Sequence, residues 1–254
     1  RLGGYDTSSL ALDVVVSGTI AYVADYTDGL QVVDISNPSA PVRIGGWVGG
    51  DVYAVALSGA LLYLADGNNG LEILDVSNPA SPVRLGNYNT SGRAEGVFVA
   101  GNYAYVADHT SGLQIIDVSN PSAPVRVGGY DTPGFAVWVT VSGSYAYVAD
   151  YGSGLQIIDV SNPSAPVRVG VYDTPGTAMR VAVRDGYAYV GDYDAGLQII
   201  DVSDPAAPVR VGFYNTPGYA RGVAFNGPVV YVADDASGVE VFDVSNPASP
   251  VLLG

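Results

Sequence analysis

The 254-residue sequence contains no cysteine, no lysine and a single histidine. Without cysteine the chain forms no disulfide and no thiolate metal site, and its redox compartment is not readable from the sequence. No uninterrupted apolar run reaches the length of about 18 residues that marks a membrane-spanning helix. We therefore predict no membrane insertion.

Positive charge is also scarce. All ten basic residues are arginine, and the formal net charge is −15. Nucleic acids and anionic membranes attract clustered positive charge, so this balance argues against both as partners. The excess of acid is explained by solubility, or alternatively by adaptation to a calcium-rich or salty exterior.

What the chain has in abundance is repetition. The tyrosine of a Tyr-Val-Ala-Asp segment, or of a close variant, recurs at Tyr22, Tyr63, Tyr105, Tyr147, Tyr189 and Tyr231, with spacings of 41, 42, 42, 42 and 42 residues. A strand-rich period of about 40 to 45 residues is typical of a β-propeller with one blade per repeat. We predict an all-β fold, in which residues 1–254 form a single six-bladed propeller domain with four antiparallel strands per blade.

The fourth copy illustrates how one blade is built. We predict strands over residues 135–142, 145–150, 155–160 and 166–172, because each run is short, β-branched or aromatic and bounded by turn-forming residues. The second and third strands are nearly continuous in apolar residues, which fits a sheet covered on both faces. No segment shows a helical period, so no helix is predicted.

Two aspartate series recur in all six copies and are expected to accept hydrogen bonds in turns and between strands. The first closes the second strand (Asp25, Asp66, Asp108, Asp150, Asp192 and Asp234), and the second lies in the third strand (Asp34, Asp75, Asp117, Asp159, Asp201 and Asp243). A catalytic carboxylate is not needed six times. A ring of calcium sites is the alternative, although one aspartate per blade falls short of the six to eight oxygens that calcium prefers. No cofactor or metal is therefore predicted, with calcium kept as the exception.

The third strand and the turn after it resemble the LVIVD repeat family. The segment GLQIIDVSNPSAPVR shows the pattern, and matching cores are found at residues 31–34, 72–75, 114–117 and 240–243. The resemblance implies a β-propeller of bacterial or archaeal surface or secreted proteins, without assigned activity and without catalytic residues. We therefore expect an extracellular or cell-surface location, with no signal peptide in this chain. Residues 112–128 and 154–170 are identical, which indicates recent duplication or deliberate construction.

The copies differ most at the start of the first strand and in the loop after the second, which open on the same face of a propeller. Three arginines there fall outside the repeated series, and we interpret them with nearby aromatic and acidic side chains as a ligand-binding rim that suits an acidic or flat ligand. Drift in surface loops is the alternative. The candidate residues are Asp13, Asp51, Tyr53, Arg93, Glu95, His109, Phe135, Trp138, Arg180, Tyr219 and Arg221.

Three functions remain open. The first is a non-enzymatic binding module that takes a protein, a peptide or an acidic glycan at this rim. The second is a glycosidase-like hydrolase with Glu95, Asp13, Asp51 and His109 as acids and bases, although no hydrolase motif occurs. The third is a symmetric scaffold without a ligand. A closed propeller has no inherent need to pair, so a monomer is expected.

The two ends of the chain resemble the fourth strand of the unit. Residues 1–6 match residues 126–131, and residues 250–254 match the first half of the same strand. We therefore predict that the N- and C-terminal segments share the last blade, with residues 2–5 paired against residues 239–244. Such pairing would remove an exposed strand edge.

Overall fold

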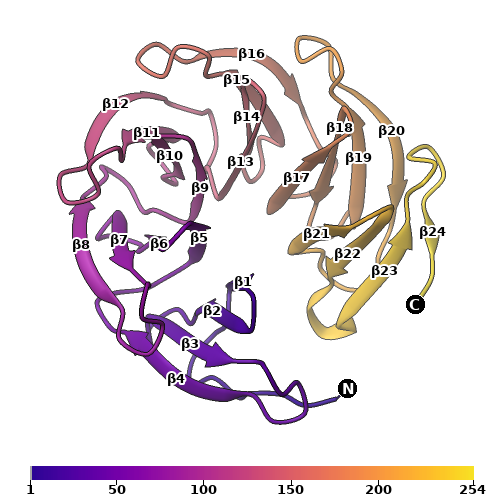
Figure 1. The fold of residues 1–254 in the computed structure, drawn as a ribbon. Helices are drawn as coiled ribbons and strands as arrows, with labels where there is room; N and C mark the ends of the chain where they lie inside the picture. Colours follow the sequence, from indigo (N-terminus) through magenta and orange to yellow (C-terminus); the bar gives the residue numbers. More distant parts are fainter. Residues whose placement is uncertain (1) are drawn as a thin grey trace. The chain divides into compact units, whose positions relative to one another are not determined.

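The computed structural model describes residues 2–254, and it is a six-bladed β-propeller with four antiparallel strands in each blade (Figure 1). Blades 1 and 2 consist of β1 (Asp13–Ser17), β2 (Ile20–Ala24), β3 (Leu30–Asp34), β4 (Val42–Trp47), β5 (Ala54–Ser58), β6 (Leu61–Ala65), β7 (Leu71–Asp75) and β8 (Val83–Tyr88). Blades 3 and 4 consist of β9 (Gly96–Ala100), β10 (Tyr103–Ala107), β11 (Leu113–Asp117), β12 (Val125–Tyr130), β13 (Trp138–Ser142), β14 (Tyr145–Ala149), β15 (Leu155–Asp159) and β16 (Val167–Tyr172). Blades 5 and 6 consist of β17 (Arg180–Arg184), β18 (Tyr187–Gly191), β19 (Leu197–Asp201), β20 (Val209–Tyr214), β21 (Gly222–Asn226), β22 (Val229–Ala233), β23 (Val239–Asp243) and β24 (Val251–Leu252).

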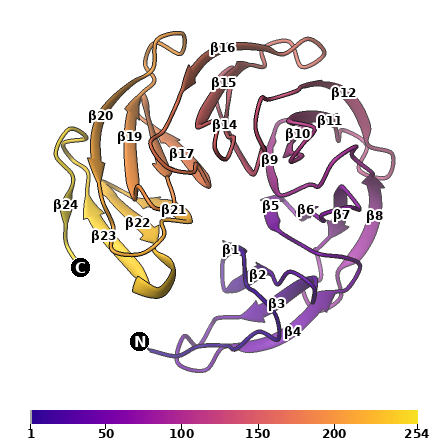
Figure 2. The same cartoon turned by 180° about the vertical axis from the view of Figure 1, so that it is seen from behind.

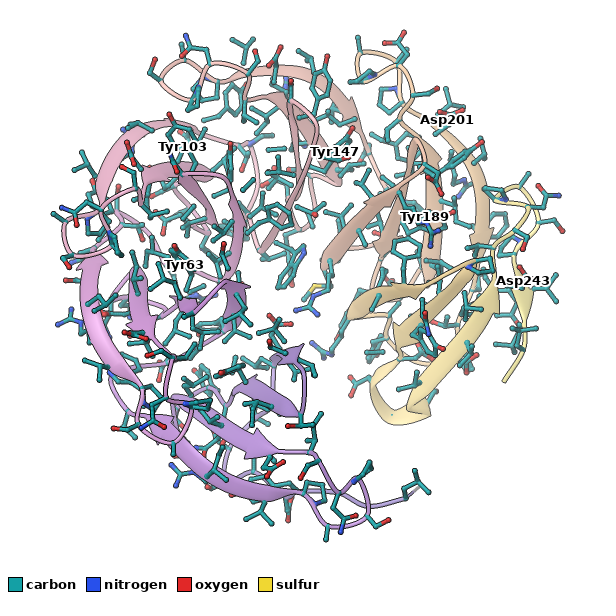
Figure 3. All side chains as sticks on the ribbon, in the orientation of Figure 1. Tyr63, Tyr103, Tyr147, Tyr189, Asp201 and Asp243 are labelled. Atoms are coloured by element: carbon teal, nitrogen blue, oxygen red, sulfur yellow. The ribbon has the colours of Figure 1, made fainter. Side chains whose placement is uncertain are left out.

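The middle strands of each blade carry the core, as the sequence predicts. In blade 4, for example, β14 and β15 pair antiparallel with Tyr147 opposite Ile157, and both side chains are buried. These strands read as continuous apolar runs because both faces of the sheet are covered. Tyr63, Tyr147 and Tyr189 occupy the same place in three different blades (Figure 3). The predicted fold class is confirmed.

The first and second strands are joined by two-residue turns whose glycines require a positive φ. Gly143 has a φ of 59°, and its equivalents Gly18, Gly59, Gly101 and Gly227 have φ values of 57–61°. A positive φ at the first of two turn residues is the pattern of a type II′ hairpin. Blade 5 differs, because Asp185 and Gly186 both have positive φ, at 50° and 80°. This is the Asp-Gly pattern of a type I′ turn.

The third and fourth strands are joined by the repeated Ser-Asn-Pro turn. In blade 4 the Oδ1 of Asp159 accepts the backbone N–H of Ser161 at 2.8 Å, and the side chain of Asn162 accepts that of Ser164 at 3.3 Å. The hydrogen bonds from Ser161 lower the pKa of Asp159 below its ordinary value. The same aspartate–serine bond occurs in all six blades, which confirms a turn role for this series. Asp201 and Asp243 show the turn position in blades 5 and 6 (Figure 3).

The fourth strand of the last blade is β24, which pairs with β23 through Phe242 opposite Leu252 and Asp243 opposite Val251. β24 follows β23 through the same short turn as in the other blades, and closing a short loop costs little chain entropy. Residues 2–5 belong to no strand, and their pairing with residues 239–244 stays a prediction.

The chain divides into two compact units. The N-terminal unit runs up to His109 and includes Gln114–Val127, and the C-terminal unit comprises Thr110–Leu113 and Gly128–Gly254. The assignment of residues 1–254 to one domain stays a prediction. Figure 2 shows the blades from behind. Within residues 2–254 the helical content is one short 3-10 turn, η1 (Asp235–Ser237), and no helix there is long and apolar enough to cross a membrane.

Candidate ligand-binding rim

The buried aspartate at the end of each second strand anchors the loops of the variable face. In blade 4, Asp150 is fully buried; its Oδ1 accepts the hydroxyl of Thr132 at 2.6 Å, and its Oδ2 accepts the backbone N–H of Gly134 at 2.9 Å. Asp108, Asp192 and Asp234 accept the same two bonds from the residues 18 and 16 positions before them. These bonds fix the segment that leads into each first strand. The predicted structural role of these four aspartates is therefore confirmed.

Blades 1 and 2 lack this pattern. Both carboxylate oxygens of Asp25 are buried without a hydrogen-bond partner among residues 2–254. Asp66 accepts a bond from the Asn69 side chain at 3.1 Å, and its Oδ1 has no partner. Burial raises the pKa of Asp66 to about 6, and the charges of Glu72 and Asp51 add to this effect.

The residue after each buried aspartate begins the loop between the second and third strands and adopts a left-handed backbone. Tyr26, His109, Tyr151 and Tyr193 have φ values of 47°, 46°, 52° and 46°. Blade 2 has Gly67 here, also at 47°. This conformation is unfavourable for bulky L-residues. The presence of tyrosine at three such positions therefore points to a role for its side chain. In four copies the same residue forms a backbone bridge to the following repeat, as between Tyr193 and Ala220.

In the N-terminal unit, five rim residues form one cluster, here called the Arg93 cluster: Tyr26, Tyr53, Arg93, Glu95 and His109. The Tyr26 and Tyr53 rings meet edge to face with centroids 5.3 Å apart, and the Cζ of Arg93 lies 5.4 Å from the Tyr53 centroid. The Nε of Arg93 donates to Glu95 at 2.7 Å, and the Nε2 of His109 lies 3.8 Å from the same carboxylate. An arginine is thus held between an aromatic ring and an acid.

The electrostatics of the Arg93 cluster follow from burial and pairing. Burial and a hydrogen bond with Tyr26 raise the pKa of Tyr53 to about 12, so its hydroxyl stays protonated at neutral pH. Burial acts to lower the pKa of Arg93, but the hydrogen bond and charge of Glu95 outweigh it and raise that pKa. The Glu95 side chain is only 13% exposed, whereas that of Arg93 is 43% exposed. The cluster therefore presents a guanidinium to solvent.

In the C-terminal unit, the guanidinium of Arg180 lies over the ring of Trp138. Its Cζ is 3.6 Å from the ring centroid, well within the range of a cation–π contact. Trp138 begins β13 and Arg180 begins β17, so the contact joins the first strands of blades 4 and 5. Gly222, at the start of β21, lies next to the guanidinium, since a Cβ there would be in van der Waals contact with the Nη1 of Arg180 at 3.9 Å.

A second group in the same unit is here called the Arg221 cluster: Tyr193, Tyr219, Arg221 and Asp235. The Tyr193 and Tyr219 rings are stacked, with centroids 4.1 Å apart and planes inclined by 2°. The Cζ of Arg221 lies 5.1 Å from the Tyr193 centroid, and its Nε and Nη2 both donate to Asp235 at 3.2 Å. Tyr219 is 45% exposed, so the stack offers an aromatic face to solvent.

The other predicted rim residues lie in different surroundings. Phe135 is 42% exposed and packs against Tyr151 with ring centroids 6.0 Å apart. Asp13 has a backbone partner, because its Oδ2 accepts the N–H of Val55 at 3.0 Å and so links β1 to β5. Asp51 lies close enough to Asp66 to raise the pKa of that carboxyl.

Sequence reasoning did not select four residues that complete these groups, namely Tyr26, Tyr151, Tyr193 and Asp235. They share the position after the buried aspartate, and the glycine of blade 2 at this position is the sequence sign of its left-handed backbone. The geometry also adds a regularity. Each of the three unrepeated rim arginines lies over an aromatic ring of the rim.

Neither a metal centre nor a catalytic dyad is assembled from the predicted acids. Among residues 2–254 there is no group of three or more side chains of the metal-binding types. Glu95 is engaged with Arg93, and Asp13 accepts a backbone bond. The arrangement is suited to holding an anion or a flat surface.

The sequence itself decides the family. The LVIVD repeat model matches residues 10–46, 49–90, 91–132, 133–174, 175–216 and 217–254. The chain belongs to the LVIVD repeat family. No match was found among curated proteins.

Solved structures that are similar to this LVIVD-repeat protein share its fold at low sequence identity. A functionally unknown protein from Desulfotomaculum acetoxidans DSM 771 has a TM-score of 0.77 at 12% identity, over 98% of this chain and 86% of that one. The β-propeller domain of Myceliophteria thermophila Cps50 (Swd1) has a TM-score of 0.75 at 13% identity, over 98% and 87%. The computationally designed Ika8 protein has a TM-score of 0.71 at 9% identity, over 96% and 73%. At such identities the likeness concerns the fold alone.

Proposed function

We propose that this LVIVD-repeat propeller is a non-enzymatic binding module of a secreted or cell-surface protein, and that its variable rim binds an acidic ligand. The observation that carries the proposal is the placement of Arg93, Arg180 and Arg221. All three lie over rim aromatics, at 5.4, 3.6 and 5.1 Å from the ring centroids. In a chain of net charge −15 and without lysine, these are exceptional positions for positive charge.

Stacking prepares an arginine for recognition of carboxylates. A ring beneath the guanidinium restricts its orientation and leaves the edge of the group to hydrogen-bond a carboxylate. In Arg93 and Arg221 the Nε and Nη2 already donate to Glu95 and Asp235, so a ligand there binds through the remaining N–H groups or displaces the acid. Less side-chain entropy is then lost when the ligand binds. The stacked pair of Tyr193 and Tyr219 supplies a flat apolar face next to Arg221. A guanidinium next to a flat aromatic face suits an acidic glycan, whose carboxylate pairs with the arginine and whose sugar ring stacks on the tyrosine. An acidic peptide or protein segment offers the same negative charge.

The scaffold alternative accounts for only part of the cost of aromatics at strained backbone positions. Tyr26, Tyr151 and Tyr193 adopt positive φ where blade 2 has glycine, at a cost of about 1–2 kcal/mol per residue. Ring contacts within the fold offset part of this cost, and a ligand that packs on the exposed rings adds a further gain. The hydrolase alternative lacks a supporting geometry, because Glu95 is held by Arg93. The binding module is therefore the function that we develop.

The proposal is tested by calorimetric titration of the purified protein with oligogalacturonate, an acidic peptide of glutamates, and a neutral malto-oligosaccharide. We expect the acidic glycan to bind and the neutral glycan to fail. Binding should weaken by about tenfold or more in Arg180→Ala and Arg221→Ala. Arg180→Lys, which keeps the charge but loses the planar stack, should also weaken it.

Two results would count against the rim. Equal binding of the neutral and acidic glycans would contradict an arginine-based site. Binding that is the same in Arg180→Ala, Arg221→Ala and the wild type would place the ligand elsewhere. Preference for the peptide over the glycan would keep the site and change the ligand class.

A further inference from the structure

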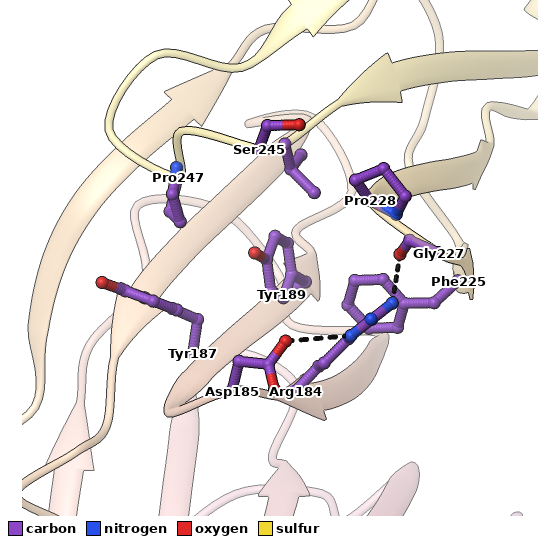
Figure 4. A pocket seen from close by; sticks show the side chains of 10 residues that line it. Arg184, Asp185, Tyr187, Tyr189, Phe225, Gly227, Pro228, Ser245 and Pro247 are labelled. Carbon is purple, nitrogen blue, oxygen red and sulfur yellow. Dashed lines mark hydrogen bonds and ion pairs between the residues drawn. The ribbon is translucent and has the colours of Figure 1, made fainter.

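Four departures from the repeat line one hollow at the turn end of blades 5 and 6. The hollow has a volume of about 340 Å³, and Figure 4 shows its walls. Arg184, Asp185, Phe225 and Pro228 stand where the other copies have different residue types. The counterparts of Arg184 are Ser17, Ser58, Ala100, Ser142 and Asn226, and every other copy has glycine in place of Asp185. The counterparts of Phe225 are the aliphatic residues Val16, Leu57, Val99, Val141 and Val183. The counterparts of Pro228 are Thr19, Ala60, Asn102, Ser144 and Gly186.

The convergence is informative because the copies are otherwise so similar. Residues 112–128 and 154–170 are identical, so unselected drift between neighbouring copies is small. Departures that arose independently would be scattered over the surface. Here they come from two hairpins of different blades and meet at one place.

Aromatic rings and prolines form the floor and sides of the hollow. Tyr189 is buried, and the Phe225 ring meets it edge to face with centroids 4.7 Å apart and planes at 87°. Tyr187, Pro228 and Pro247 also line the hollow, and Figure 4 shows them around it. A concave wall of this kind, with a few polar groups, is the usual form of a small-ligand pocket, and volumes of about 300–1,000 Å³ are typical.

One cation is fixed at the edge of this hollow. The Nε of Arg184 donates to the Oδ2 of Asp185 at 3.0 Å, and its Nη1 donates to the carbonyl of Gly227 (Figure 4). The bond to Gly227 holds a guanidinium that starts in blade 5 against the turn of blade 6. The Asp185 side chain is 81% exposed. An ion pair this exposed is weak, so a carboxylate from a ligand can take the place of Asp185 at little cost.

We propose that this hollow, the blade 5–6 pocket, binds a small carboxylic acid that carries an aromatic ring. The carboxylate of the ligand accepts hydrogen bonds from Arg184, and its ring packs against Phe225 and Tyr187. The site lies at the turn end of the blades and shares no residue with the rim, so it does not depend on the function proposed for the rim. It also assigns a role to Arg184, the one arginine that is neither in the repeated series nor at the rim.

The test is calorimetric titration of the whole chain with phenylacetate, together with two matched probes. Phenylacetamide has the ring without the charge, and acetate has the charge without the ring. We expect saturable binding of phenylacetate, and binding weaker by about tenfold or more for both probes. Failure of phenylacetate to bind, or equal binding of phenylacetamide, overturns the proposal.

The variants restore the repeat and are therefore compatible with the fold. Arg184→Ser and Phe225→Val install residues that the other blades carry at these positions, and each should weaken phenylacetate binding by about tenfold or more. Ser142→Ala, a change at the equivalent turn of blade 4, should leave phenylacetate binding unaltered. Wild-type affinity in both repeat-restoring variants overturns the proposal. The proposal is also overturned if the wild type does not bind phenylacetate and the Arg184→Ser variant melts at a lower temperature than the wild type. Arg184 would then have only the structural role of joining blades 5 and 6.

Discussion

The rings of Tyr193 and Tyr219 lie parallel, 4.1 Å apart, although Tyr193 has a φ of 46°. Two opposing energies meet at this residue. The left-handed backbone costs a non-glycine residue about 1–2 kcal/mol. Stacking of two aromatic rings returns about 0.5–1.5 kcal/mol beyond the burial of their surface. The backbone strain at Tyr193 and the stacking energy of its ring are therefore nearly equal and opposite.

Substitutions of Tyr193 should separate these two energies. Tyr193→Ala loses the stack and keeps the strain, whereas Tyr193→Gly loses both. We expect the glycine variant to be more stable than the alanine variant by about 1 kcal/mol, measured by urea unfolding. Tyr145, at the start of β14, is the control. There the order should reverse, because glycine weakens a strand. The same order at both positions would contradict the strain at Tyr193.

The hydroxyl of Thr132 should stabilise the fold through its bond to buried Asp150. Thr132→Val removes this 2.6 Å bond and leaves a buried carboxylate oxygen without its donor. The expected loss is about 1–3 kcal/mol in the free energy of unfolding.

Thr7→Val is the matched control for Thr132→Val. Thr7 stands 18 residues before Asp25, as Thr132 does before Asp150, but the oxygens of Asp25 have no partner. Thr7→Val should change the free energy of unfolding by less than about 0.5 kcal/mol. An equal loss in the two variants, in the same urea titration, would show that Thr7 does bind Asp25 in solution.

Much of the fold was predictable from the sequence because a repeat averages out local ambiguity. A short apolar run such as residues 155–160 is uncertain alone, but six aligned copies reveal the common strand and its turn residues. The chain ends were not predictable in the same way. Two segments there carry the same strand pattern, and only the structure shows that β24 is the strand paired with β23.

The rim was predictable as a region but not as a set of contacts. Variation among copies pointed to Arg93, Arg180 and Arg221, yet their aromatic partners depend on backbone geometry. Tyr193 reaches Arg221 because the left-handed residue after Asp192 places its ring there. The blade 5–6 pocket was missed because its walls come from turns of different blades, which no single repeat reveals.

Stability should fall as the pH rises from about 4 to about 6, through the ionisation of Asp66. Its pKa is about 6 in the folded chain and near 3.9 in an unfolded one. In this window the folded state binds more protons, so raising the pH favours unfolding, and the ionised buried carboxylate costs about 3 kcal/mol above pH 6. Urea unfolding at pH 5 and at pH 7.5 measures the difference.

The variant Asp66→Asn should flatten this pH dependence, because an amide does not titrate. It should not abolish it, since burial also raises the pKa of Asp192 to about 6. If wild type and variant have the same slope between pH 5 and pH 7.5, the slope arises from the overall charge of −15 rather than from this carboxylate.

Among residues 2–254, blade 6 shows no ion pair of the kind that its position in the repeat would allow. In blade 2 the Nε of Arg84 donates to Glu72 at 2.5 Å and its Nη2 at 3.0 Å, and arginines of four other blades bond a glutamine in the same way. In blade 6 the acid is Glu240, and Leu252 stands in the place of the arginine. The register confirms the equivalence, because Leu252 pairs with Phe242 as Arg84 pairs with Leu74.

Leu252→Arg should therefore stabilise the protein. The Oε2 of Glu240 is buried without a partner, and a charge-assisted bond to it is expected to contribute about 1.5–3 kcal/mol. The gain appears as a higher urea midpoint. Leu253→Arg is the control, because it adds the same charge one residue away, where the side chain points to the other face of the strand. Any general benefit of positive charge in this acidic protein is shared by both variants. Only the excess of Leu252→Arg over Leu253→Arg reports on Glu240, and an excess of zero would mean that β24 does not hold the register described here.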